Sequence, residues 1–239
     1  MVIRHDDDVQ RAENETAQPG SEDAAGPTEW GEHPHGVGSW WEEFGTEPPD
    51  DSRLDPELLA HGDRRNVVDA YRYWTREAIV ADIDRRRHPF HVAIENFGHD
   101  ANIGTVVRTA NAFAAAAVHI VGRRRWNRRG AMVTDRYQRI VHHADVAALL
   151  DFADREELTV VAVDNVPGST PLETARLPRN CLLLFGQEGP GVTDQARQAA
   201  VMTVSIAQFG STRSINAGVA AGIAMHSWIS QHADLTRAW

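Results

Sequence analysis

Short apolar runs alternate with amphipathic segments through the second half of the chain. Runs that are apolar throughout are typical of strands buried on both faces, and apolar residues at three- and four-residue spacing are typical of covering helices. The predicted strands are 91–97, 117–122, 158–164, 181–186 and 201–207. The predicted helices are 102–116, 145–157, 193–200 and 215–230. The sequence therefore predicts an α/β domain with a mostly parallel sheet flanked by helices, over residues 90–239.

The residues before this domain follow two other patterns. Residues 1–60 are mainly polar and acidic and predict a largely disordered tail. Within it, TEWGEHPHGVGSWWEEF (28–44) interleaves four aromatic residues with acids and glycines, which indicates either a strap packed on the folded domain or a docking peptide for another protein. Residues 63–86 carry one apolar stripe at helical spacing, so 61–89 is predicted to be a helical extension.

Charge is unevenly distributed along the chain. The formal net charge is −10, but residues 1–60 hold sixteen Asp and Glu against three Arg, and the remainder holds eighteen acids against twenty-one Arg. The acidity therefore belongs to the tail, and the rest is mildly basic, which leaves a nucleic-acid partner open.

Three loops that follow predicted strands carry unusual residues. In GHDANIGTVVR, Asn102 can cap the next helix, and Gly104 lies one turn below Arg108, which would leave room for a phosphate at the guanidinium. In LLLFGQEGPGV, Glu188 lies between glycines, which favours a ligand-facing acid over a solvated one. In VSIAQFGSTRSINAG, Ser211 and Ser214 can each cap the last helix.

These loops resemble, in order, the three signature motifs of the SpoU (TrmH-type) 2′-O-ribose RNA methyltransferases of the SPOUT class. The first motif matches at Asn102, Gly104, Arg108 and Ala110, the second over residues 185–191, and the third at Ser214, Ile215, Asn216 and Ala220. The sequence departs from the family pattern at Gly218, where Ser is common, and at Asp100, where Pro is frequent.

The resemblance implies a C-terminal deep trefoil knot, S-adenosylmethionine as methyl donor, and a homodimer in which Arg108 reaches toward the partner's cofactor. It implies a catalytic set of Asn102, Arg108, Glu188, Ser214 and Asn216. The implied cofactor-binding residues are Gly186, Glu188, Gly189, Ile206, Ile215 and Asn216.

The segment RRRWNRR predicts a surface for RNA, because Arg clusters bind phosphates and an interleaved Trp can stack on an unpaired base. Its residues are Arg123, Arg124, Arg125, Trp126, Arg128 and Arg129, and a solvated basic loop is the alternative. The expected activity is therefore methylation of a ribose 2′-hydroxyl in tRNA or rRNA. An RNA-binding or ribosome-assembly protein with a vestigial site is the alternative, motivated by Gly218 and the acidic tail.

The remaining features restrict the class of protein. No apolar stretch reaches the roughly 18 residues of a membrane span, and MVIRHDDD lacks the apolar segment of a signal peptide. A lone Cys181 in an apolar run indicates a reducing compartment, so a cytoplasmic protein is expected. His33 and His35 lack a third ligand, and no metal is predicted.

Overall fold

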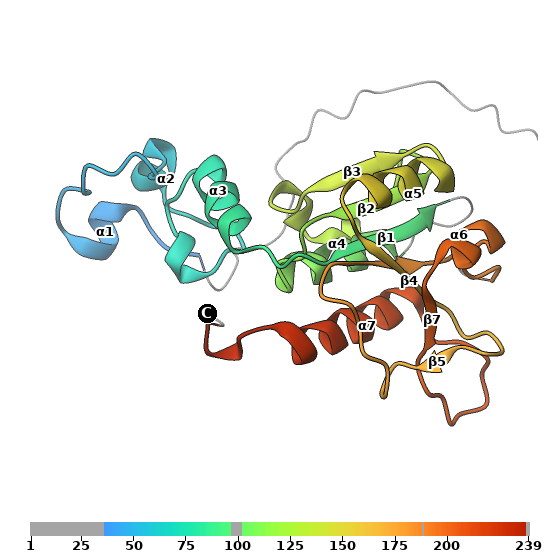
Figure 1. The fold of residues 1–239 in the computed structure, drawn as a ribbon. Helices are drawn as coiled ribbons and strands as arrows, with labels where there is room; N and C mark the ends of the chain where they lie inside the picture. Colours follow the sequence, from blue (N-terminus) through green and yellow to red (C-terminus); the bar gives the residue numbers. More distant parts are fainter. Residues whose placement is uncertain (1–35, 97–101, 188, 238–239) are drawn as a thin grey trace, which may run out of the picture.

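The computed structural model describes residues 36–96, 102–187 and 189–237 (Figure 1). Its helices are α1 (Trp40–Phe44), α2 (Pro56–His61), α3 (Arg76–Arg86), α4 (Ile103–Ala112), α5 (Val146–Arg155), α6 (Asp194–Ala199) and α7 (Ala217–His232). Its strands are β1 (His91–Asn96), β2 (Val118–Gly122), β3 (Ile140–His143), β4 (Thr159–Val163), β5 (Thr170–Pro171), β6 (Cys181–Phe185) and β7 (Met202–Ser205). Short 3-10 turns are η1 (Asp69–Tyr71), η2 (Arg129–Ala131), η3 (Thr134–Arg136) and η4 (Leu235–Arg237).

The seven strands form one sheet in the order β3-β2-β1-β6-β4-β7-β5, and every pairing is parallel. This confirms the predicted parallel α/β class and all five predicted strands to within a residue or two. The sequence missed β3 and β5 because IVHH is half polar and β5 has only two residues at the sheet edge.

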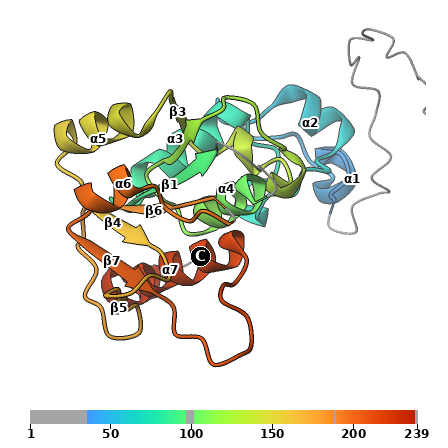
Figure 2. The ribbon, with the colours of Figure 1, turned by 90° about the vertical axis from the view of Figure 1, so that its right-hand side faces the viewer.

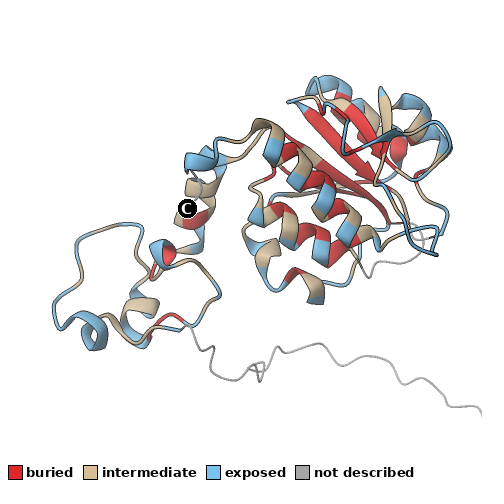
Figure 3. Cartoon of the chain, turned by 90° about the horizontal axis from the view of Figure 1, so that it is seen from below, coloured by how far each residue is buried: buried red, intermediate tan, exposed pale blue. Residues whose placement is uncertain are grey.

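Two apolar cores lie on the two faces of this sheet, because successive side chains of a strand point to opposite sides. In β6, Leu183 and Phe185 pack with α4 and α7, whereas Leu182 and Leu184 pack with α5 and α6. Figure 2 shows α5 and α6 separated from α7 by the strands. In Figure 3 the buried residues gather in the sheet, where β1, β2, β4 and β6 are buried over most of their length, while the covering helices also carry exposed residues.

The N-terminal helices form a small module beside the sheet (Figure 1). The single helix predicted over 63–86 is wrong in its first half, where the chain makes a loop and η1 before Thr75 caps α3. The cause is the buried Asp63 carboxylate, which accepts hydrogen bonds from the backbone N–H groups of Arg65 and Tyr73 and from the Arg65 guanidinium. Burial alone would raise the pKa of Asp63, but these donors hold it below its ordinary value.

Part of the predicted acidic tail belongs to this module. Residues 36–61 contain α1 and α2, and no helix was predicted over residues 36–60. The Trp40 ring contacts Tyr73 edge-on at 5.4 Å, and the Tyr73 hydroxyl donates to the Gly38 carbonyl. The described end of the predicted strap thus packs on the module itself, and residues 1–35 lie outside the described residues. Among the described helices, none is long and apolar enough to cross a membrane.

Candidate active site at the C-terminal edge of the sheet

The strand order brings the three predicted motif loops to one edge. β1, β6, β4 and β7 are consecutive neighbours, and parallel strands all end at the same edge. The first motif follows β1, the second follows β6, and the third follows β7. Chain progression also reverses here, since the chain moves from β1 toward β3 and then returns to place β6 beside β1, which is where open α/β sheets bind ligands.

A side-chain hydrogen bond joins the first and third motifs. Nδ2 of Asn216 donates to Oδ1 of Asn102 over 2.9 Å. Asn102 occupies the N-cap position of α4, but its side chain does not cap the helix, so its reading as a simple helix cap is wrong. Asn216, rather than Ser211 or Ser214, caps α7, accepting from the N–H groups of Gly218 and Val219 at Oδ1.

The second motif forms a closed glycine turn. Gln187 and Gly191 exchange two backbone hydrogen bonds of 3.2 and 3.1 Å. A Cβ on Gly186 would lie 1.9 Å from the carbonyl carbon of Gly191, and Gly191 itself has a φ of +74°, so both positions require glycine. Gly189 lies at the tip of the turn with a φ of +94°. The predicted site residue Glu188 lies outside the described residues.

Two neighbouring residues that were not predicted as site residues hold the second and third motif loops by hydrogen bonds. Asp164 and Asn165 follow β4, the strand between β6 and β7. Oδ2 of Asp164 accepts from the Val192 N–H at 3.0 Å, and Nδ2 of Asn165 donates to the Arg213 carbonyl at 3.0 Å. An Asp-Asn pair directly after a buried strand was a usable sequence signal, since polar residues at strand ends face the ligand edge.

Arg108 is exposed on α4 and forms no ion pair with any residue that the structure describes. The room expected for a phosphate above Gly104 is not there. A Cβ on Gly104 would lie 2.7 Å from the Ala131 backbone nitrogen and 2.8 Å from Gly130 Cα, so that face of α4 is filled by η2.

The predicted site residues of the third motif loop differ in how far they are buried. Ile206 is partly buried against the core and Ile215 is half-buried, whereas Ser214 is exposed. Gly218 packs against α4, where its Cβ would lie 3.1 Å from Cγ2 of Thr105. Gly218, at the position where Ser is common in the family pattern, therefore lies where α7 and α4 approach each other closely.

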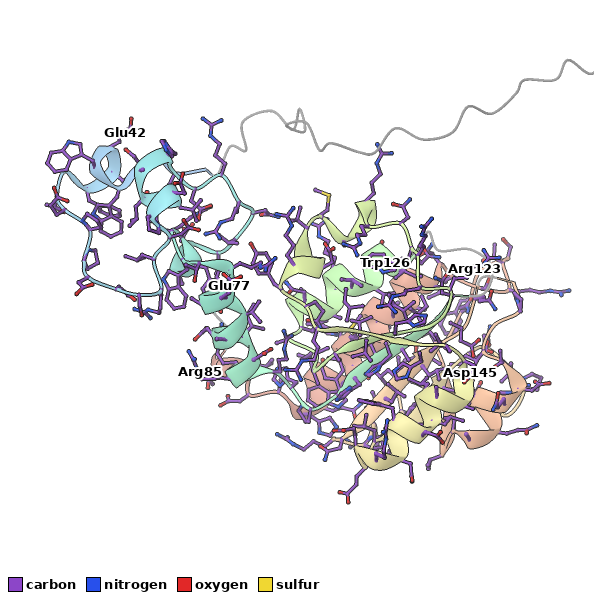
Figure 4. The ribbon with its side chains drawn as sticks, turned by 90° about the horizontal axis from the view of Figure 1, so that it is seen from above. Glu42, Glu77, Arg85, Arg123, Trp126 and Asp145 are labelled. Carbon is purple, nitrogen blue, oxygen red and sulfur yellow. The ribbon has the colours of Figure 1, made fainter. Side chains whose placement is uncertain are left out.

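The Arg-rich segment follows β2 at the same edge, and Figure 4 shows Arg123 and Trp126 on the sheet-bearing part of the chain. All five arginines are exposed. Trp126 is partly buried against the core, and the Arg128 guanidinium lies 5.7 Å from its ring centre. Trp126 therefore anchors the loop while its arginines face solvent.

Other groups in the described ranges do not add to this edge. No cluster of three or more His, Cys, Asp or Glu there is arranged to hold a metal ion. Burial raises the pKa of the Cys181 thiol to about 12, so it is not a nucleophile. A depression lined by residues 166–170, Arg197 and residues 200–203 lies at the outer edge of the sheet, and no predicted site residue lines it.

The fold defines a parallel α/β protein in which the three motif loops follow β1, β6 and β7 at one edge of the sheet. The family model described as "SpoU rRNA Methylase family" matches residues 89–226, more than half of the chain, so the chain belongs to that family. This confirms the resemblance found in the three motifs.

Individual relatives agree with the family. An uncharacterized tRNA/rRNA methyltransferase of Mycobacterium ulcerans is 31% identical over 152 residues, covering 56% of this chain and 44% of the relative. The tRNA (guanosine(18)-2′-O)-methyltransferase of Escherichia coli K12 is 23% identical, covering 64% of this chain and 68% of the relative. The chain thus matches less than half the length of the first relative.

Among solved structures, the SpoU methyltransferase AviRb from Streptomyces viridochromogenes, in complex with AdoMet, has the same fold. It aligns with a TM-score of 0.55 and 23% identity, covering 61% of this chain and 58% of that one.

Proposed function

We propose that this protein is an S-adenosylmethionine-dependent RNA methyltransferase that methylates a ribose 2′-hydroxyl in tRNA or rRNA, and that it acts in the cytoplasm, where these RNAs occur. The carrying observation is the Asn216–Asn102 hydrogen bond, which joins two motifs from opposite ends of the domain. The Escherichia coli relative, a tRNA (guanosine(18)-2′-O)-methyltransferase, supports the ribose hydroxyl as acceptor. The AviRb complex with AdoMet supports the donor.

The residues present fit such a donor. No atom of the described residues lies within 4 Å of where a Cβ on Gly189 would stand, so the backbone at the tip of the turn is open to a ligand. The molecule would be held by Gly186, Gly189, Ile206, Ile215 and Asn216. Glu188 is expected beside them. When bound, S-adenosylmethionine supplies an electrophilic methyl group.

In this proposal Arg108 positions the acceptor. Its planar guanidinium can clamp the phosphate next to the target ribose through two parallel hydrogen bonds. A guanidinium stays protonated in proteins and is a poor base, so Arg108 polarises the hydroxyl and the proton leaves to phosphate or water. Positioning of this kind can lower a barrier by several kcal/mol, up to about 7–11 kcal/mol in the best cases.

The Arg loop (residues 123–129) would bind the RNA backbone next to this site. Its exposed guanidinium groups supply phosphate contacts, and the partly exposed face of Trp126 can stack on a base.

We further propose that the chain forms a homodimer through α4 and α7 and that its C-terminal part is threaded as a trefoil knot. Two apolar side chains one turn apart on α7, Val219 (53% exposed) and Ile223 (40% exposed), support the dimer, since a pair of this kind favours a partner surface. The insertion of β6 between β1 and β4 supports the threading.

The test is methyl transfer in vitro. The purified chain is incubated with radiolabelled S-adenosylmethionine and unmodified tRNA or rRNA, and the product nucleotide is identified by mass spectrometry. Label on a ribose 2′-oxygen supports the proposal, whereas label on a base contradicts the acceptor. RNA binding without any binding of S-adenosylmethionine in calorimetry would instead favour an RNA-binding protein with a vestigial site.

A further inference from the structure

We propose that Glu95 and Asn96, the last two residues of β1, are positioning residues that hold the donor loop and the RNA loop in fixed relation to each other. Here the donor loop is residues 186–193 and the RNA loop is the Arg loop, 123–129. The inference deepens the proposed function and rests on it.

β1 lies between the two strands that lead into these loops. It pairs with β6, which leads into the donor loop, and with β2, which leads into the RNA loop. Consecutive residues of a strand point to opposite faces of the sheet, so Glu95 and Asn96 diverge from one rigid backbone. Neither residue belongs to the signature motifs matched by this sequence.

Glu95 holds the end of the donor loop. Its side chain is 1% exposed, and its carboxylate accepts from the Thr193 hydroxyl at 2.7 Å and from the Thr193 N–H at 3.2 Å. The next residue back, Val192, is held by Asp164 from β4 on the other side of β6. Two carboxylates from flanking strands therefore fix two consecutive residues that leave the glycine turn. Burial raises the pKa of Glu95, as expected for an acid sealed under the loop.

Asn96 holds the start of the RNA loop. Its side chain is fully buried, and its Nδ2 donates to the carbonyl oxygens of Arg123 (2.7 Å) and Arg125 (3.1 Å). Its backbone carbonyl also accepts from the Arg123 N–H at 2.9 Å. The backbone at Arg123 and Arg125 is thus fixed, while both residues remain exposed to solvent.

Only the donor half of the Asn96 side-chain amide is hydrogen-bonded within the described residues. Its Oδ1 is buried and has no hydrogen-bond partner in the part of the chain that the structure describes, which is unfavourable because the desolvation of that oxygen is not offset. A leucine of similar size would avoid this penalty but could not hold the two carbonyl groups. The side chain of Asn96 therefore stabilises the RNA loop and not the apolar core.

The experiment measures donor and RNA affinity separately for wild type, Glu95→Ala, Glu95→Gln and Asn96→Leu. Glu95→Ala should weaken S-adenosylmethionine binding about tenfold in calorimetry, the equivalent of one charged hydrogen bond, and leave RNA affinity within about twofold. Glu95→Gln keeps an acceptor oxygen for Thr193 and should restore most of the donor affinity. Asn96→Leu should weaken RNA binding about three- to tenfold in fluorescence anisotropy without changing donor affinity.

A matched control is Asn111→Leu, because Asn111 also has a buried Oδ1 without a partner in the described residues but holds neither loop. It should leave both affinities unchanged. Variants that lose both affinities together, or neither, while the wild type binds both ligands, overturn this inference and leave the proposed function standing. A folded wild type that binds neither ligand overturns the proposed function, and this inference with it.

Discussion

The side-chain amide of Asn216 donates to Oδ1 of Asn102 across 114 residues of sequence, while its own Oδ1 caps α7. One side chain thus fixes the start of the last helix and orients the first motif. Asn102 caps nothing in return, although it stands at the N-cap position of α4. The two ends of the hydrogen bond therefore have different structural roles, which mutations can separate.

Alanine at each end should affect stability differently. Asn216→Ala removes the α7 cap and should lower the free energy of unfolding by about 1 kcal/mol, whereas Asn102→Ala removes no cap and should lower it by less than about half of that. Both should reduce methyl transfer at least about tenfold, since one hydrogen bond near the reacting groups is lost. Thermal unfolding and turnover measure the two effects. Full turnover in Asn102→Ala would show that the hydrogen bond has no role in the reaction.

Arg108→Lys tests the guanidinium fork. Lysine keeps the positive charge but cannot form two parallel hydrogen bonds with a phosphate. Turnover should fall by about 10²-fold, because a small misplacement of reacting groups has effects of that size, while stability is unchanged at this exposed position. Single-turnover kinetics with saturating RNA measure the effect. A near-normal rate would mean that charge alone is enough.

Two glycine-to-alanine substitutions in helices should have opposite signs. Gly104→Ala places a Cβ 2.7 Å from the Ala131 backbone nitrogen and should destabilise the protein by about 1–3 kcal/mol through overpacking. Gly222→Ala meets only Cγ2 of Thr109 at 3.7 Å, and should stabilise α7 by about 0.5–1 kcal/mol. Urea unfolding compares the two variants. Equal effects would contradict the close approach of α4 and η2.

Arg124→Ala should weaken RNA binding and make it less dependent on salt. Loss of one phosphate contact should lower the slope of log affinity against log salt by about 0.7–0.9. Arg85→Ala is the control, since Arg85 is exposed in the N-terminal module and paired with Asp82 at 2.6 Å. Anisotropy titrations at several salt concentrations measure the slopes. Equal slopes for wild type and Arg124→Ala would favour a solvated loop.

Three histidines cross the face of the sheet that α5 covers. His91 on β1, His119 on β2 and His143 on β3 form a chain with nitrogen–nitrogen distances of 2.9 and 2.8 Å. Burial lowers the pKa of His91 to about 4 and that of His119 to about 3, from an ordinary 6.5, and it also lowers the pKa of His143. These rings are neutral in the folded protein at pH values where they are protonated in the unfolded chain.

The protein should therefore lose stability as pH falls below 6.5, the ordinary pKa of these groups, toward about 4. Each such histidine contributes about 1.4 kcal/mol per pH unit, because the unfolded state binds one more proton. His119→Leu should make this slope shallower by one proton, and the exposed His61→Leu should not. Urea unfolding between pH 6 and 5 measures the slopes. An unchanged slope in His119→Leu would contradict a neutral buried ring.

The prediction of the fold succeeded where a pattern was local and strong. The run CLLLF became β6 at the centre of the sheet, and the apolar runs around 91–97 and 158–164 became β1 and β4. It failed where tertiary contacts override local preference. Residues 63–74 carry a helical stripe, yet buried Asp63 gathers donors from Arg65 and Tyr73 and keeps that segment out of helix.

The site was predictable to the same extent. Family motifs placed Asn102, Arg108 and Asn216 in one protein, but nothing in their spacing indicated that Asn216 caps α7 while it binds Asn102. Asp164, Asn165, Glu95 and Asn96 match no motif, because each acts on the backbone of a loop distant in sequence. The prediction of room for a phosphate above Gly104 was wrong, because Gly130 fills that room. Gly130 lies 26 positions further along the chain.

By itself, the sequence determined the parallel α/β class, the positions of five of the seven strands and the family, because hydrophobic periodicity and short motifs depend only on residues close together in the chain. Only the tertiary structure decided which side chains meet at the edge of the sheet. The order β1-β6-β4-β7 brings together loops that are up to about 120 residues apart, and the hydrogen bonds between those loops depend on distances that exist only after the strands have paired.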